Sequence, residues 1–208
     1  MKLQSMTHTS VLLLLVCWLI GPAMVAQAAD PGTFLQPALI TPDGQTADGL
    51  LLNIICRQAG IKCIYSNLID SAGLDSLEAG LMEVPVSMRG AGPVKTLILV
   101  PGGSTKGLGA AKINEQKEME RVSQIVARAR QSGMKIIVCH LGGESRRGAL
   151  SDPFNAQAAD VGDAIVVVRG GNNDAFFTNI AEPRGVPLYE VEEIGDLGDV
   201  LNQLFLKE

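Results

Sequence analysis

Short apolar runs of strand length recur along this 208-residue chain, and a helical or glycine-rich stretch separates each run from the next. The run predicted as a strand over residues 96–100 ends directly at Pro101, and both faces of such a strand should be covered. Strands that alternate with helices form parallel sheets, because parallel neighbours need crossover connections. The pattern predicts a doubly wound α/β fold with a mostly parallel sheet of five or six strands, Rossmann-like or flavodoxin-like in strand order.

The hydrophobic periodicity and the capping residues place most elements. Thr46 is the predicted cap of the first helix and Asn114 that of a longer one, while Pro42 to Gly44 is a predicted turn. Residues 66–93 show no assignable pattern. The predicted strands cover residues 38–40, 61–65, 96–100, 136–139, 164–168 and 186–189, and the predicted helices cover 47–59, 114–132, a short stretch opening at Asp152-Pro153, 172–180 and 197–205.

The N-terminus has the layout of a secretory signal peptide. Lys2 precedes an apolar run over residues 11–20, and Ala26-Gln27-Ala28 has the small-x-small form of a cleavage site. The apolar run is about half the ~20 residues that a membrane-spanning helix needs. We therefore expect cleavage after Ala28, which leaves residues 29–208 as a single α/β domain in the periplasm or outside the cell, with no membrane span.

The composition argues against a nucleic-acid partner. Asp and Glu number 22 against 17 Lys and Arg, and aromatic residues make up 4% of the chain. Nucleic-acid binding needs cations that neutralise phosphates, and often aromatic rings that stack on bases. Apolar residues, at 47%, suffice for a packed core. Nothing in the composition names a cofactor or an oligomeric state.

Cleavage after Ala28 would leave one histidine, His140, and three cysteines, Cys56, Cys63 and Cys139. An odd number of cysteines leaves at least one thiol unpaired in an oxidising compartment. Cys56 and Cys63 either form a disulfide or pack in the core. We favour packing, because a disulfide demands Cα atoms within roughly 7 Å of each other.

Glycines, hydroxyls and charged side chains gather in the segments that follow the strands. Ligands of open parallel sheets bind at this carboxyl edge, and successive glycine amides can form an anion-binding concavity there. Arginine suits bidentate contact with carboxylate or phosphate, so the cations of these segments favour a small anionic ligand. The predicted ligand-binding residues are Gly102, Gly103, Ser104, Thr105, Lys106, Gly107, Gly109, Gly142, Gly143, Glu144, Ser145, Arg146, Arg147 and Arg169.

A structural interpretation stands beside this one: the adjacent arginines would pair with Glu144, Asp152 or Asp174 and hold the loops together. The familiar nucleotide motifs fail. Leu108 stands where a P-loop needs lysine, and Lys112 stands where a dinucleotide fingerprint needs its third glycine. The nucleophile-elbow pattern around Ser104 also lacks its last glycine.

Two further functions are open. A hydrolase or transferase could use the same pocket with Ser104 as nucleophile or His140 as base, provided that the two lie within hydrogen-bond reach. A lone histidine without a second ligand at metal spacing predicts no metal site, and we favour a structural role for His140. Alternatively the chain could dock another exported protein, which an exposed apolar patch would indicate.

The segments 39–48, 102–111 and 140–152 resemble those of an uncharacterised family of exported bacterial proteins, catalogued as domain of unknown function 6305. The resemblance covers nearly all of residues 29–208. It implies export and an α/β fold, and it supplies no catalytic residue.

Overall fold

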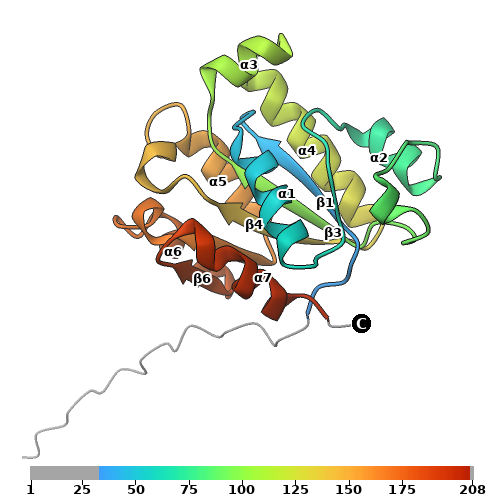
Figure 1. Ribbon diagram of the computed structural model, residues 1–208. Helices are drawn as coiled ribbons and strands as arrows, with labels where there is room; N and C mark the ends of the chain where they lie inside the picture. Colours follow the sequence, from blue (N-terminus) through green and yellow to red (C-terminus); the bar gives the residue numbers. More distant parts are fainter. Residues whose placement is uncertain (1–32, 207–208) are drawn as a thin grey trace, which may run out of the picture.

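The computed structural model describes residues 33–206, and the predicted signal peptide over residues 1–28 lies outside this range. Six strands form one parallel sheet in the order β2-β1-β3-β4-β5-β6 (Figure 1). This confirms the doubly wound α/β fold, and the order is the flavodoxin-like one. The strands are β1 (Ala38–Asp43), β2 (Cys63–Tyr65), β3 (Thr96–Pro101), β4 (Lys135–His140), β5 (Ala164–Val168) and β6 (Leu188–Val191).

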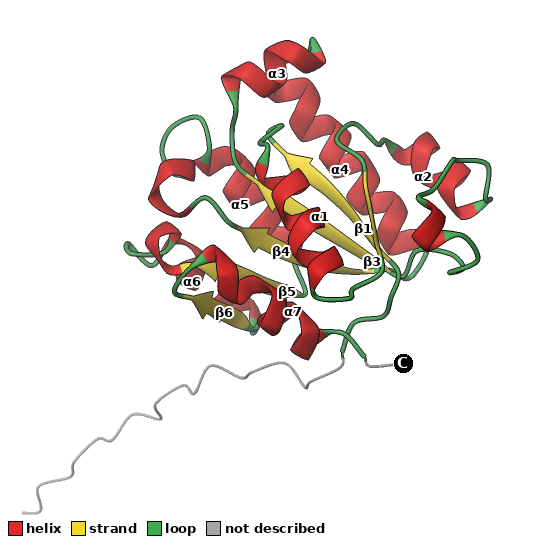
Figure 2. Ribbon diagram, viewed as in Figure 1, coloured by secondary structure: helices red, strands yellow, loops and turns green. Residues whose placement is uncertain are grey.

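Helices cover both faces of the sheet (Figure 2). Core residues of α1 and α7 pack on one face, and those of α2, α4, α5 and α6 pack on the other. None of the described helices is long and apolar enough to cross a membrane. The helices are α1 (Asp48–Gln58), α2 (Ser71–Glu78), α3 (Thr105–Ala111), α4 (Glu115–Gln131), α5 (Asp152–Val161), α6 (Phe176–Arg184) and α7 (Leu197–Leu204), and the 3-10 turns are η1 (Val86–Met88), η2 (Gly143–Arg146), η3 (Arg169–Gly171) and η4 (Ile194–Asp196).

The apolar strands bury side chains on both faces. In β3, Leu97 and Leu99 join the core beneath α4, while Ile98 and Val100 join the core beneath α1. All four are fully buried. The sheet therefore separates two hydrophobic layers, which explains why the strand sequence is continuously apolar rather than alternating.

Strand β1 is longer than predicted. Pro42 and Asp43, expected in a turn, continue the strand and pair with Val100 and Pro101 of β3. The turn begins instead at Gly44, whose φ of +98° favours glycine. The pairing extends because β3 also continues, to Pro101. Asp43 therefore lies within the sheet.

Several helices differ from the prediction. Helix α3 lies in a stretch expected to be a loop, and α2 and η1 lie in the unassigned residues 66–93. Helix α1 starts at Asp48, although the Thr46 hydroxyl still accepts its amide proton at 3.3 Å. Helix α6 starts at Phe176 and runs to Arg184 rather than to Ile180.

Candidate functional site

The strand order reverses between β1 and β3, and doubly wound sheets commonly bind ligands at such a switch point. Here the two loops that follow these strands hydrogen-bond to each other. The amide of Gly102 donates to the Asp43 carbonyl at 2.8 Å, and the amide of Ser104 donates to the Gly44 carbonyl at 2.9 Å. A Cβ added at Gly107 would lie 2.0 Å from the Gln45 carbonyl oxygen. The loops are thus in close contact across the switch point.

The amides of Gly102, Gly103 and Gly107, which were predicted to bind an anion, therefore donate to groups within the protein. The Gly103 amide donates to Ser151 Oγ at 3.1 Å, and the Gly107 amide donates to Ser104 Oγ at 3.0 Å, which makes Ser104 the N-cap of α3. On α3, Thr105, Lys106 and Gly109 are exposed. Lys106 makes no ion pair with a described residue, so it is a free cation beside this loop.

A polar pocket opens further along the same edge, between the segments that follow β4 and β5. We call it the edge pocket; its volume is about 340 Å³. It lies at the carboxyl ends of the strands, where the sequence predicted a site. Its lining residues are Glu144, Arg147, Gly148, Asp152, Gly170, Asn173 and Asp174.

Arg147 is held from several sides on the wall of the edge pocket. Its Nε donates to Asp152 at 2.7 Å, and its Nη1 and Nη2 donate to the two carboxylate oxygens of Asp174 at 2.8 and 3.0 Å. Nη1 also donates to the Gly171 carbonyl at 2.6 Å, and the guanidinium lies 4.1 Å from the centre of the Phe176 ring. Its orientation is therefore fixed.

The Arg147–Asp174 pair joins a largely buried side chain to an exposed one. The Arg147 side chain is 13% exposed, whereas that of Asp174 is 64% exposed. Hydrogen bonds to Asp174 raise the pKa of Arg147, and those from Arg147 lower the pKa of Asp174 to about 2. Both groups are charged across the physiological pH range.

The other two predicted arginines do not line the edge pocket. Arg146 crosses Gly142 and donates to Asp48 of α1 at 3.0 Å. Arg169 is half-exposed and pairs with Glu190, at 3.6 Å, and with Glu192. The three arginines thus each have a carboxylate partner. Asp152 and Asp174, named by the structural interpretation, are the partners of Arg147.

The remaining predicted residues lie in the turn η2, except Gly142, which directly precedes it. Gly143 has a φ of +53°, Ser145 donates its hydroxyl proton to the Gly142 carbonyl at 2.7 Å, and Glu144 is exposed at the edge pocket. The Gly143 carbonyl lies 3.1 Å from His140 Nε2. This turn therefore connects the end of β4 to the pocket wall.

His140 and Ser104 make separate structural contacts. His140 is buried, packs 4.9 Å from Phe177 between ring centres, and has its pKa lowered, mainly by burial. Ser104 Oγ caps α3, and no hydrogen bond among the described residues joins it to His140. The hydrolase or transferase alternative stays a prediction.

A buried polar cluster beneath the switch point was not predicted. Asp43 is fully buried, and neither of its carboxylate oxygens accepts a hydrogen bond from a described residue. Glu118 of α4 accepts the Gly44 amide at 3.1 Å and pairs with Arg121 at 2.8 Å. Burial, and then the charge of Glu118, raise the pKa of Asp43 well above its usual value. One sequence signal was available, because Glu118 continues the buried α4 stripe of Val122 and Ile125.

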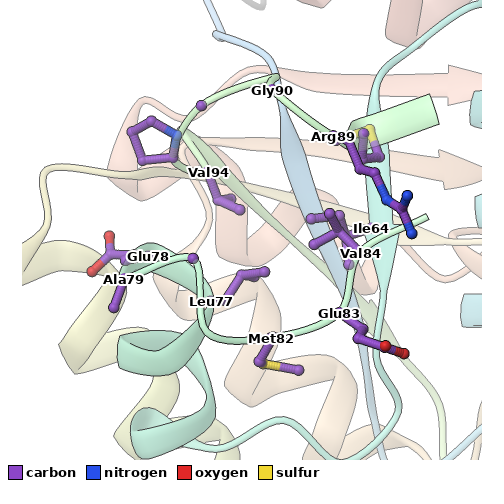
Figure 3. Close-up of a pocket in the computed structure, with 14 residues that line it drawn as sticks. Ile64, Leu77, Glu78, Ala79, Met82, Glu83, Val84, Arg89, Gly90 and Val94 are labelled. Carbon is purple, nitrogen blue, oxygen red and sulfur yellow. The ribbon is translucent and has the colours of Figure 1, made fainter. Parts of the chain in front are cut away.

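A second hollow, of about 540 Å³, lies away from this edge, beneath the segment between α2 and β3 (Figure 3). Ile64, Leu77 and Met82 give it an apolar lining. Glu78 at its rim is already paired with Arg128 at 2.7 Å. It can accommodate an apolar group, and Glu83 and Arg89 add a charge of each sign to its lining.

Exposed apolar residues occur on α1, where Leu50, Leu51 and Ile54 are 49%, 37% and 47% exposed. Leu50 and Ile54 are four residues apart and share a helix face. An exposed apolar patch was the expected sign of a surface that docks another exported protein. This docking function stays a prediction.

Comparisons with known proteins give a family and distant structural likenesses. A GDSL-like lipase from Bacteroides thetaiotaomicron VPI-5482 has a TM-score of 0.35 at 10% identity, covering 76% of this chain and 68% of the lipase chain. A mutant of the esterase AlinE4 has a TM-score of 0.31 at 12% identity, covering 81% and 82%. Superpositions this loose carry no argument about chemistry, and no curated protein matches the sequence. The family model described as "Domain of unknown function (DUF6305)" matches residues 35–205, and the chain therefore belongs to this family.

Proposed function

We propose that this chain binds a small ligand bearing a carboxylate or phosphate group in the edge pocket, with Arg147 as its principal contact. Support comes from the position of the pocket at the carboxyl ends of β4 and β5, where parallel sheets bind ligands. Further support comes from the fixed guanidinium of Arg147. A guanidinium that is already oriented loses little conformational entropy when it binds an anion.

The observation that carries the proposal is the bidentate contact between Arg147 and Asp174. The carboxylate of Asp174 accepts from both terminal nitrogens of the guanidinium, which is the geometry of a bound carboxylate or phosphate. Asp174 is largely exposed, while Asp152 holds Nε from the other side. Asp174 therefore occupies the position that an incoming anion would take, and Asp152 keeps the guanidinium in place.

The exchange of Asp174 for a ligand should cost little. Asp174 is 64% exposed, so water can solvate its carboxylate when it leaves the guanidinium, whereas Arg147, at 13% exposed, has to keep an anionic partner. The carboxylate of Asp174 can turn into solvent, and the ligand anion then receives the same two hydrogen bonds. Glu144 and Asp152 also line the pocket, so a second, cationic or hydroxyl-bearing part of the ligand would be accepted there.

A thermal-shift screen tests the proposal. The purified protein is heated with inorganic phosphate, succinate or adenosine monophosphate, each over a range of concentrations. Binding to the native state stabilises it by RT ln(1 + [L]/Kd), or about 2.7 kcal/mol at a concentration of 100 Kd. We expect one of these anions to raise the Tm of the wild type. The variant Arg147→Lys keeps the positive charge but loses the bidentate guanidinium, so it should lose most of this rise in Tm.

Arg130→Lys is the matched control. Arg130 also forms a bidentate pair, with Asp163 at 2.6 and 3.0 Å, but it lies outside the edge pocket. It should leave the ligand-dependent rise unchanged. An equal loss of the rise in both variants, or no rise with any anion in the wild type, would contradict anion binding at Arg147.

A further inference from the structure

The hollow between α2 and β3 has an apolar interior, and we call it the apolar hollow (Figure 3). Its deepest lining residues, Ile64, Leu77 and Val94, belong to the core, with exposures of 9%, 7% and 4%. Met82 and Val84 pack against the same core but are only partly buried. Its volume of about 540 Å³ lies within the range of ligand sites, roughly 300–1,000 Å³. The hollow is therefore large enough to hold an apolar chain.

The segment that forms this hollow also keeps apolar side chains in water. Leu81 and Val86 are 80% and 75% exposed, more than any other large apolar side chain of the described residues. Leu81 is next to the lining residue Met82, and Val86 is two residues before the lining residue Met88. Methionine side chains are flexible and adapt to the shape of a bound apolar group. Exposed apolar residues around an apolar hollow indicate a surface that binds an apolar partner.

Three charged side chains line the apolar hollow, and one of them is already neutralised. Glu78 pairs with Arg128 at 2.7 Å. Glu83 and Arg89 are exposed, and neither makes an ion pair with the other or with any further residue in the described part of the chain. In the view of Figure 3 both extend to the same side of the hollow, away from Glu78. The rim therefore presents one unpaired anion and one unpaired cation beside an apolar interior.

We infer that the apolar hollow binds a single-chain amphiphile with a zwitterionic head group, such as an alkyl phosphocholine. The alkyl chain packs against Leu77 and Val94, because its transfer out of water is favourable. Arg89 donates hydrogen bonds to the phosphate, and Glu83 attracts the cationic nitrogen. A purely anionic or purely cationic head group would meet a like charge at the rim, so the zwitterion is the complementary ligand. The apolar hollow shares no lining residue with the edge pocket, and it can bind this ligand whether or not the edge pocket binds an anion.

Isothermal titration calorimetry with three amphiphiles that share a dodecyl chain tests the choice of head group. Dodecylphosphocholine, dodecanoate and dodecyltrimethylammonium are each titrated into the purified protein below their critical micelle concentrations. We expect dodecylphosphocholine to bind about fivefold more tightly than the other two, which is the ratio for an exposed ion pair of about 1 kcal/mol. Octylphosphocholine should bind more weakly than dodecylphosphocholine, because a shorter chain buries less apolar surface.

The absence of binding by dodecylphosphocholine, or an equal affinity for all three head groups, would overturn the inference. So would binding to phosphatidylcholine vesicles without binding of monomeric dodecylphosphocholine, because this face would then contact a membrane surface rather than hold one chain.

Variants at the rim test which side chains recognise the head group. Arg89→Gln should weaken the binding of dodecylphosphocholine about fivefold and bind dodecyltrimethylammonium in preference to dodecanoate. Glu83→Gln should show the opposite preference between these two. Arg57→Gln is the matched control, because Arg57 is also exposed but lies outside the hollow, and it should leave all three affinities unchanged.

Val84→Phe tests the interior of the hollow. The larger side chain occupies part of the volume that the alkyl chain needs, so all three amphiphiles should bind more weakly. Circular dichroism establishes that each variant is folded, and the two exposed rim positions decide the outcome if Val84→Phe unfolds. An unchanged affinity for dodecylphosphocholine in both rim variants, or an equal loss of affinity in Arg57→Gln, would overturn the inference.

Discussion

At the scale of single residues, Asp43 is a carboxylic acid in a buried position, where the ionised form is energetically costly. It lies at the buried end of β1, where no described residue donates a hydrogen bond to it, and burial and then the charge of Glu118 raise its pKa. Glu118, by contrast, accepts hydrogen bonds from Gly44, Gln45 and Arg121. A proton retained by this cluster therefore belongs on Asp43, because an isolated buried charge is strongly unfavourable.

This assignment predicts how the variant Asp43→Asn depends on pH. The folded protein holds the proton of Asp43 at pH values where the unfolded chain, with a carboxyl pKa near 3.8, has lost it. Wild-type stability contributed by this group is thus fully present below pH 3.8 and falls as pH rises toward the folded pKa. The asparagine cannot ionise, so we expect Asp43→Asn to gain stability relative to wild type as pH rises above 4.

Urea denaturation of both proteins between pH 4 and pH 8 measures the difference. Asp160→Asn, at an exposed position of α5, is the control and should follow the wild type throughout. If Asp43→Asn were less stable than wild type by an amount that grows with pH, Asp43 would be an ionised and paired carboxylate instead.

At the scale of elements, α3 is held to the β1–α1 loop by a contact between backbones. Gly107 lies in α3 where a Cβ would come within 2.0 Å of the Gln45 carbonyl oxygen, whereas a Cβ at Gly109 meets nothing within 4 Å. Both glycines are helical, so their intrinsic cost to the helix is the same. Any difference between their alanine variants therefore reports the loop contact.

We expect Gly107→Ala and Gly109→Ala to change stability in opposite directions. Gly109→Ala should stabilise by up to about 1 kcal/mol, since alanine favours the helix over glycine. Gly107→Ala should destabilise by about 1–3 kcal/mol, the usual cost of forcing extra volume into a packed contact. Chemical denaturation measures both, and equal changes in the two variants would show that α3 does not depend on this approach.

The elements also show which parts of the fold can be predicted from local sequence patterns. Apolar runs and caps predicted the six strands and α4, because those signals lie within each segment. Helix α3 escaped prediction because glycine-rich sequence is a poor helix former, and its stability comes from the Ser104 cap and the contact at Gln45. Helix α2 carried a readable signal, since the Asp70 side chain accepts the Gly73 amide at 2.7 Å.

At the scale of the whole molecule, the strand order and the loop contacts together decide where a ligand can enter. Parallel strands predicted that the site lies at the carboxyl edge. Their sequence could not predict that the loops after β1 and β3 pair with each other, because that pairing joins Asp43 to Gly102 across 59 residues (102 − 43) of chain. The edge pocket follows β4 and β5 and is lined in part by Arg147. It opens at the edge of the sheet that the sequence predicted.

The same limit applies to the predicted cations. Their position at one edge followed from the strands, but their partners lie on distant elements. Asp48 of α1 binds Arg146, and Glu190 of β6 binds Arg169. Of the three arginines, only Arg147 keeps its guanidinium on the wall of the edge pocket, so the proposed anion site narrows to this residue.

The most direct test of that site is the affinity of Asp174→Asn for inorganic phosphate and succinate, measured by isothermal titration calorimetry beside wild type. Asp174 competes for the guanidinium, so its removal should tighten binding severalfold. Glu144→Gln also removes one negative charge from the edge pocket, but it leaves the Arg147 guanidinium paired with Asp174. It should therefore change the affinity much less. Tighter binding by Asp174→Asn alone is the predicted result. Unchanged or weaker binding by Asp174→Asn, or equal tightening in both variants, would contradict the claim that Arg147 binds the anion.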